Sequence, residues 1–313
     1  MTFRAPRLGL DIGGTKTHAV VLDTDGRVLA EDRVRAGWGG QEVHDQAVKV
    51  ARRTLAAAGL ASGDLEAVGV GIPGAVDHRS GTVVQAVNLG LDRLPLAARL
   101  GTTLGATVHV ENDVNAAALG LLAQGAGGPR GTDSLAYLNL GTGLAAGIVL
   151  DGELWRGAGG AAGEIGHVPV DPAGPPCGCG MRGCLETFAS GSGLATQWRA
   201  AGRTDELRPA RLAQDAVTDP VARRILDGLH RGVAAAVRLL VLTVDVDAVV
   251  LGGGIARLGA DLLAPVTQVL RSWEAESGFL ASVAPSRRVS LLRPDGPVAA
   301  IGAALLGEAP SRR

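Results

Sequence analysis

Residues 8–35 decide the fold, and they read LGLDIGGTKTHAVVLDTDGRVLAEDRVR. A short apolar run at 8–12 is broken by Gly13-Gly14, and a run rich in Val and Thr follows at 16–22. An Asp-Gly turn signal then leads into a third run at 27–35. Strand, glycine turn, strand, Asp-Gly turn and strand together predict a β-meander.

The same order of runs and turns recurs in residues 135–156, which read LAYLNLGTGLAAGIVLDGELWR. Asn139 corresponds in this alignment to Asp11, and Gly141 corresponds to Gly13. An internal repeat of this length predicts two related α/β domains. A chance similarity between two glycine-broken hairpins is the alternative.

The rest of the chain alternates between helical and strand patterns. Alternation of this kind predicts an α/β protein with mostly parallel sheets. A chain of 313 residues is long enough for two domains. Strands are expected at 65–71, 107–110 and 244–251, and helices at 41–60, 114–123, 219–242 and 297–306.

Composition excludes several classes of protein. The chain is 46% hydrophobic and 19% charged, which is unlike a disordered protein. Its 30 basic and 31 acidic residues leave no electrostatic footprint for nucleic acid. No apolar stretch approaches the ~18 residues of a membrane span, so no membrane association is expected. No apolar signal region precedes the first strand, so a cytoplasmic location is expected.

The first glycine turn has the chemistry of a phosphate site. Glycines after a strand let backbone N–H groups approach phosphate oxygens, and a hydroxyl and an ammonium add donors. These features predict that the turn is a phosphate-binding hairpin, in which Asp11 holds Mg²⁺ directly or through water. A plain tight hairpin with an exposed lysine is the alternative. The residues concerned are Asp11, Gly13, Gly14, Thr15 and Lys16 in the first turn, and Gly141, Thr142 and Gly143 in the second.

These two turns resemble the paired phosphate loops of the actin-like ATPase superfamily. Within it, the chain resembles the ROK family of sugar kinases and repressors, especially the bacterial glucokinases, from Leu8 to about Leu306. The resemblance implies two actin-like (ribonuclease H-like) domains with a central cleft between them. They are expected at 1–112 with 297–313, and at 113–296. It also implies that ATP with Mg²⁺ phosphorylates the 6-hydroxyl of a hexose.

Gly252, Gly253 and Gly254 end a strand-like run. In the ROK family the matching segment lies beside the adenosine of ATP. A tight turn from strand to helix is the alternative.

The sequence Glu111-Asn112-Asp113 places carboxylates where a strand gives way to a helix. A carboxylate there can accept a proton from a substrate hydroxyl, whereas an N-cap role is the alternative for Asp113. The ROK resemblance implies that Asn112 and Asp113 contact the sugar and that Asp113 is the catalytic base. An ordinary carboxylate with a pKa near ~4 would be ionised at neutral pH.

All three cysteines lie within eight residues, next to a histidine, in the order His-x9-Cys-x-Cys-x4-Cys. One imidazole and three thiolates are the ligands of a closed tetrahedral zinc site. Reduced structural cysteines are the alternative. The ROK family carries this spacing as its zinc signature, which implies structural Zn²⁺ bound by His167, Cys177, Cys179 and Cys184.

Two acids flank the predicted metal site: Glu164 precedes His167, and Glu186 follows Cys184. Zinc would hold both acids toward the hydroxyls of a sugar; surface carboxylates are the alternative. The resemblance implies sugar contacts by these acids and by His167 itself. Gly74 and Asn88 fall at further sugar-contact positions of the family.

Glucose is the expected sugar, because the sequence around Asn88 and Leu94-Pro95-Leu96 looks most like the glucokinases. Kinases for fructose, mannose, N-acetylglucosamine or N-acetylmannosamine use very similar frameworks. A sugar-sensing regulator without catalysis is the other alternative. The family's repressors carry an N-terminal helix-turn-helix module, which is not expected ahead of a strand at Leu8. Family members are commonly homodimers or homotetramers.

Overall fold

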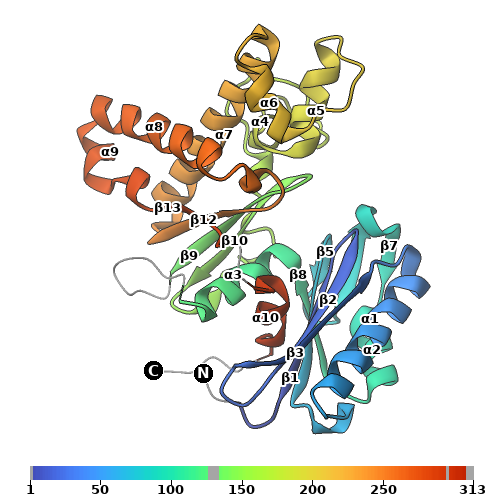
Figure 1. Ribbon diagram of the computed structural model, residues 1–313. Helices are drawn as coiled ribbons and strands as arrows, with labels where there is room; N and C mark the ends of the chain where they lie inside the picture. The colour runs from blue at the N-terminus through green and yellow to red at the C-terminus, as the bar shows by residue number, and fades with distance from the viewer. Residues whose placement is uncertain (1–2, 126–133, 294–295, 308–313) are drawn as a thin grey trace. The chain divides into compact units, whose positions relative to one another are not determined.

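The computed structural model describes residues 3–125, 134–293 and 296–307. The chain divides into two compact units, Met1–Ala126 with Asp295–Arg313, and Gly127–Pro294. In Figure 1 the first unit runs from blue to teal and includes the dark red helix α10, and the second runs from green to orange.

The elements of the first unit are β1 (Arg7–Ile12), β2 (Lys16–Leu22), β3 (Val28–Arg35), α1 (Gly39–Ala57), η1 (Ser62–Asp64), β4 (Ala67–Ile72), β5 (Ala75–Asp77), β6 (Thr82–Ala86), η2 (Val87–Leu89), β7 (Leu91–Leu94), α2 (Leu96–Leu104), β8 (Val108–Asn112), α3 (Asp113–Ala123) and α10 (Val298–Ala304). Those of the second unit are β9 (Leu135–Leu140), β10 (Leu144–Leu150), β11 (Glu153–Leu154), η3 (Ile165–His167), α4 (Leu185–Ala189), α5 (Gly191–Ala200), α6 (Pro209–Asp215), α7 (Pro220–Val244), β12 (Ala248–Gly252), η4 (Ile255–Leu258), α8 (Ala260–Glu276), α9 (Gly278–Val283), η5 (Pro285–Arg287) and β13 (Val289–Leu291).

The two large sheets have the same strand order and directions. In the first unit the order is β3-β2-β1-β4-β8, and in the second it is β11-β10-β9-β12-β13. The first three strands of each unit form an antiparallel meander, and the last two run parallel to the first strand. Asp11 is aligned with Gly71 of β4, and Asn139 with Gly252 of β12. The structure therefore confirms the internal repeat that the sequence predicts.

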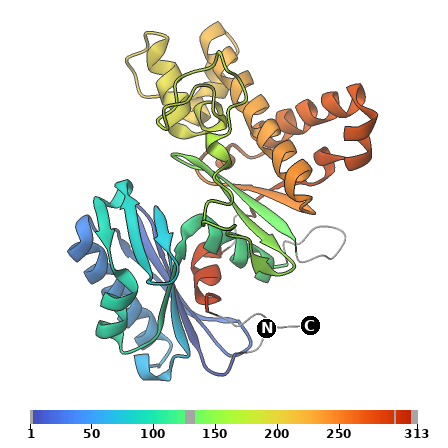
Figure 2. The ribbon, with the colours of Figure 1, turned by 180° about the vertical axis from the view of Figure 1, so that it is seen from behind.

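Helices cover both faces of the first sheet. Figures 1 and 2 show α1 and α2 on one face, and α3 and α10 on the other. The apolar side chains of Leu8, Leu10 and Ile12 alternate along β1 and pack into the core beneath α1 and α2. A third, smaller sheet, β5-β6-β7, also belongs to this unit.

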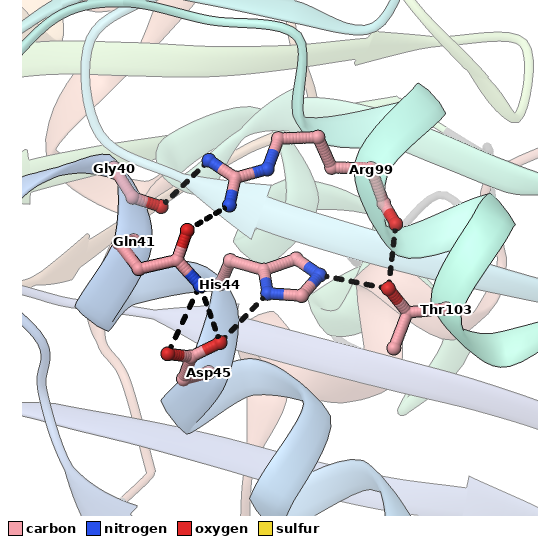
Figure 3. A network of polar contacts seen from close by, with 6 residues as sticks. All are labelled: Gly40, Gln41, His44, Asp45, Arg99 and Thr103. Atoms are coloured by element: carbon pink, nitrogen blue, oxygen red, sulfur yellow. Dashed lines mark hydrogen bonds and ion pairs between the residues drawn. The ribbon is translucent and has the colours of Figure 1, made fainter.

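A polar network joins α1 to α2, as Figure 3 shows. Arg99 of α2 donates to Oε1 of Gln41 in α1 (2.6 Å). His44 Nε2 lies 3.0 Å from Oγ1 of Thr103, and its Nδ1 lies 3.0 Å from Oδ1 of Asp45. Both ring nitrogens of this buried histidine therefore have partners, as a buried polar side chain requires.

Helices pack on one face of the second sheet, the face to which every second side chain of β9 and β10 belongs. Ala136, Leu138 and Leu140 of β9 join apolar residues of α4, α5, α6, α7 and α8 in one core. Helix α7 begins at Pro220, after Asp219 accepts the Val221 N–H as its N-cap. It ends at Val244, and the next residue, Asp245, is its C-cap with a φ of 55°, so the strand expected from residue 244 begins only at Ala248. None of the helices in the described ranges combines the length and the apolar character needed to cross a membrane.

The first unit extends beyond the expected boundary at residue 112, because α3 packs within it. Helix α10 lies along α3 and against β1 and β4. Four glycines permit this close approach, since a Cβ at any of them would overlap a backbone carbonyl oxygen across the contact. They are Gly9 in β1, Gly69 in β4, Gly120 in α3 and Gly302 in α10.

Replacing Gly69 by alanine is expected to lower the free energy of unfolding by about 1–3 kcal/mol. The new Cβ would meet the carbonyl oxygen of Ala303, and the backbone of α10 would have to move. Chemical denaturation of the purified protein measures the change. Gly63→Ala is the control, because the added methyl would have no neighbour within 4 Å. Equal stability of the two variants would contradict the close packing.

Candidate functional site

The first predicted phosphate turn joins β1 to β2 and is exposed at its tip. The Gly13 N–H donates to the Lys16 carbonyl (2.9 Å), and Gly14, Thr15 and Lys16 are exposed. Asp11 lies one residue before the end of β1. Burial raises its pKa to about 7, the charge of Asp113 acts in the same direction, and Lys16 opposes both. A divalent cation would favour the ionised form of such a carboxylate, so Asp11 fits the predicted Mg²⁺ site.

Asn112, rather than Asp113, is the N-cap of α3. Its Oδ1 accepts the Val114 N–H (2.9 Å) and lies 3.4 Å from the Asn115 N atom. Its Nδ2 donates to the Gly74 carbonyl (3.2 Å). The capping role considered for Asp113 is therefore filled by its neighbour. The structure does bring Gly74 and Asn112 together.

Asp113 is the first residue of α3, and its Oδ1 accepts the Val114 N–H (2.9 Å). Burial raises the pKa of Asp113 to about 6, against the pull of backbone N–H groups. The ordinary pKa near ~4 expected from the sequence is therefore wrong. The side chain is still mostly ionised at neutral pH, and it is a stronger base than an exposed aspartate.

A buried acid, Glu111, precedes Asn112 and Asp113 at the end of β8. Glu111 is only 1% exposed, and its Oε1 accepts from the Asn112 N–H and from Nδ2 of Asn115, both at 2.9 Å. Its Oε2 lies 3.4 Å from Nδ1 of His78, in the β5–β6 turn. These contacts hold the strand-to-helix junction that carries Asp113.

Asn88 lies beside the first phosphate turn. It is exposed in the short helix η2, and its carbonyl oxygen would lie 3.4 Å from a Cβ placed on Gly14. The predicted residues of the first unit thus form two adjoining groups. One joins Gly14 to Asn88, and the other joins Gly74, Asn112 and Asp113.

The second phosphate turn joins β9 to β10 and lies against the predicted glycine segment. The Gly141 N–H donates to the Gly143 carbonyl (3.1 Å). Gly253 has a φ of +85°, and a Cβ there would approach both Oδ1 of Asn139 and the Leu140 carbonyl to 2.6 Å. The close approach that only glycine permits brings residues 252–254 to this turn.

A pocket of about 710 Å³ opens beside this turn within the second unit. Gly141, Thr142 and Gly254 line it, as do apolar side chains including Ala195 and Ile255. The volume and the mixed lining suit a nucleoside-sized ligand. The remaining lining residues are Gly191, Ser192, Trp198, Arg199, Thr204, Asp205, Glu206, Leu207 and Pro209.

The histidine and the three cysteines of the predicted metal site come together. Nδ1 of His167 and Sγ of Cys177 are 3.6 Å apart, and Sγ of Cys179 and Sγ of Cys184 are 3.8 Å apart. The ligand atoms of His167, Cys177 and Cys179 all lie within 4.8 Å of one another. Tetrahedral zinc with ordinary bond lengths places two sulfurs about 3.8 Å apart, and nitrogen and sulfur about 3.6 Å apart. The spacing of these pairs fits zinc, and Cys184 is close to Cys179 but lies outside the group of three whose ligand atoms are all mutually within 4.8 Å.

The two flanking acids have different surroundings. Glu164 is exposed, directly before η3. Glu186 is half-buried in α4, and its Oε2 accepts the Leu144 N–H (3.1 Å) at the start of β10. Glu186 is therefore attached to the second phosphate turn as well as being close in sequence to the cysteine cluster.

The sequence profile of the ROK family matches residues 7–306. The chain belongs to the ROK family. A glucokinase of Halalkalibacterium halodurans is 32% identical to it over 280 residues, which are 83% of this chain and 84% of the relative.

Two solved ROK structures share the fold along nearly the whole chain. The ROK hexokinase from Thermus thermophilus is 34% identical, with a TM-score of 0.78 over 96% of this chain and 97% of that one. A glucokinase from Streptomyces griseus, in complex with glucose and AMPPNP, is 33% identical, with a TM-score of 0.73 over 96% and 98%. The protein therefore has the actin-like ATPase fold expected from its sequence.

Other ROK relatives differ in the function that their names state. An N-acetylgalactosamine kinase of Shewanella sp. strain ANA-3 is 33% identical over 84% of this chain and 86% of the relative. A xylose repressor of Caldicellulosiruptor bescii is 30% identical over 67% of this chain and 55% of the relative. Membership of the ROK family alone thus leaves the sugar and the activity to be argued from residues.

Two features, one in each unit, are not predicted by the sequence. The sequence assigns no role to Glu111, because the burial of this side chain depends on the surrounding helices and strands. The pocket residues of α5 and of the loop at 204–209 carried no motif. A glycine pair and a serine at the start of α5 were the only local signal near them.

Proposed function

We propose that this ROK protein is an ATP-dependent kinase that phosphorylates the 6-hydroxyl of glucose. The carboxylate of Asp113 carries the proposal. Burial raises the pKa of this carboxyl group, which makes it a stronger base. Asp113 is the first residue of the capped helix α3, and it is close enough to Asp11 for their charges to interact. A base beside an acid suited to Mg²⁺ is what transfer of a phosphoryl group to an alcohol needs.

In the proposed reaction, Asp113 accepts the proton of the sugar's 6-hydroxyl. The hydroxyl oxygen forms a bond to the γ-phosphorus of ATP, and the bond from that phosphorus to the β–γ bridging oxygen breaks. ADP leaves with the electron pair. Little covalent chemistry falls to the protein, so positioning and charge stabilisation supply most of the rate.

The nucleotide contacts come from glycine-rich backbone. The turns at Gly13–Lys16 and at Gly141–Gly143 offer N–H groups to the phosphates, and Lys16 adds a charge. The pocket beside Gly254 has room for adenosine. Asp11 would hold Mg²⁺, which when bound neutralises charge on the phosphates.

The sugar contacts are proposed on both units. The first unit offers Gly74, Asn88, Asn112 and Asp113. The second offers Glu164, His167 and Glu186, with zinc held by His167, Cys177, Cys179 and Cys184. Because protein ligands fill all four positions, the metal's contribution is to fix the loop that presents these side chains.

A coupled assay of ADP release across a panel of hexoses tests the proposal. Glucose is expected to give the highest kcat/KM among glucose, fructose, mannose and the 2-acetamido sugars. A higher value for another sugar would correct the substrate and keep the kinase. If the protein binds a sugar but releases no ADP with any sugar of the panel, the alternative function, a sugar-sensing regulator without catalysis, would be favoured. The match to a xylose repressor is the reason for considering that alternative.

The rate should depend on pH through Asp113. Its carboxylate must be ionised to accept a proton, and its pKa is raised to about 6. We therefore expect kcat/KM for glucose to be level above about pH 7 and to fall below pH 6, approaching tenfold per pH unit. Asp11 titrates nearby and Lys16 faces it, so the profile is measured at saturating Mg²⁺ and ATP. A level profile down to pH 5 would contradict the assigned base.

A further inference from the structure

The second phosphate turn forms hydrogen bonds with α4 and with the start of α5, the two helices that follow the cysteine cluster in the sequence. The N–H groups of Gly191 and Ser192 donate to the carbonyls of Gly141 (2.9 Å) and Thr142 (3.0 Å). The carboxylate of Glu186 accepts the Leu144 N–H (3.1 Å). Three hydrogen bonds therefore attach the turn to α4 and to the start of α5.

These bonds orient the peptide groups of the turn. In a trans peptide the N–H points away from the preceding carbonyl. Because the Gly141 and Thr142 carbonyls face the N–H groups of α5, the N–H groups of Thr142 and Gly143 point to the opposite side. That orientation offers N–H donors to an anion.

Glu186 is itself held by the cluster. Cys184 is the N-cap residue of α4, and its carbonyl accepts the Thr187 N–H (2.9 Å) and the Thr187 hydroxyl (2.7 Å). The Leu185 N–H donates to the Val168 carbonyl (3.0 Å), next to His167. The first turn of α4, which carries Glu186, is thus fixed by the two chain segments that supply the metal ligands.

We propose that Glu186 is a positioning residue for the nucleotide, acting through the Gly141–Gly143 turn, in addition to its proposed contact with the sugar. One carboxylate oxygen accepts the Leu144 N–H, and the other is left for a sugar hydroxyl. The inference rests on the proposed function, because it takes that turn to bind the phosphates of ATP.

The affinity for nucleotide distinguishes a positioning role of Glu186 from an effect of its charge alone. A carboxylate close to the phosphates of ATP repels them, so removing its charge alone would tighten nucleotide binding. Losing the acceptor for the Leu144 N–H would loosen the turn and weaken nucleotide binding. The two effects have opposite signs.

The test measures the Kd of Mg·AMPPNP by calorimetry, on the full chain and without any sugar. Glu186→Ala removes the acceptor and is expected to weaken binding about tenfold. Glu186→Asp keeps the charge but withdraws it by one methylene, and should weaken binding similarly. Glu186→Gln keeps an acceptor oxygen without the charge, and should bind as tightly as the wild type or more so.

Glu153→Ala is the matched control, because it removes an exposed carboxylate from β11 of the same unit. Its Kd is expected to equal that of the wild type. Nucleotide binding unchanged in both Glu186→Ala and Glu186→Asp would overturn the positioning role and leave the kinase proposal standing. Failure of the wild type to bind Mg·AMPPNP would overturn both. The glutamine variant binding as weakly as the alanine variant would also count against positioning.

Discussion

Replacing Asp113 by asparagine is expected to lower kcat by about 10²–10⁴ while leaving ATP binding nearly unchanged. The amide has nearly the shape of the carboxylate but cannot accept the proton of the sugar's 6-hydroxyl. Asn112 would still cap α3, so the helix that carries residue 113 should form as before. Steady-state kinetics with glucose and ATP, together with a nucleotide-binding measurement, give the two quantities.

Asp92→Asn is the control for this experiment. Asp92 is an exposed acid in β7 of the same unit, and it belongs to neither group of predicted site residues. Its kcat should match that of the wild type. An Asp113→Asn enzyme with wild-type turnover would remove Asp113 from the mechanism.

Removing the metal, or replacing Cys179 by serine, is expected to lower both the melting temperature and the affinity for sugar. Between His167 and Cys184 the structure has no helix or strand, only two isolated bridges, and most side chains of this loop are exposed, so little apolar burial holds it. A bound metal would replace the missing core, and its binding energy would add to folding energy. A loss of about 3 kcal/mol corresponds to a fall in Tm of about 6–12 °C for a domain of this size.

Metal analysis and thermal unfolding, before and after treatment with a chelator, measure these effects. Met181→Ala is the control, because this exposed residue lies in the same loop and supplies no ligand. It should keep both the metal and the Tm. Active protein that contains no zinc would refute the assignment of the cluster.

The local sequence was sufficient to predict the hairpins and the ROK family. Glycine turns between apolar runs depend on neighbouring residues alone, and β2 begins at residue 16 and ends at residue 22, where the pattern places it. The same holds for the order of histidine and cysteines, since ligand spacing is a local property of a loop. Their convergence in the structure agrees with that expectation, and the matched strand orders confirm the repeat.

Burial and distant contacts were decided only by tertiary structure. The pKa of Asp113 depends on the helices and strands packed around it, and sequence alone assigned it the value of an exposed acid. Helix α3 belongs to the first unit because α10, from the far end of the chain, packs against it through glycine backbone. The bond from Glu186 to Leu144 joins residues 42 positions apart. Periodicity and turn signals act over a few residues, whereas desolvation and such hydrogen bonds arise only when distant segments meet.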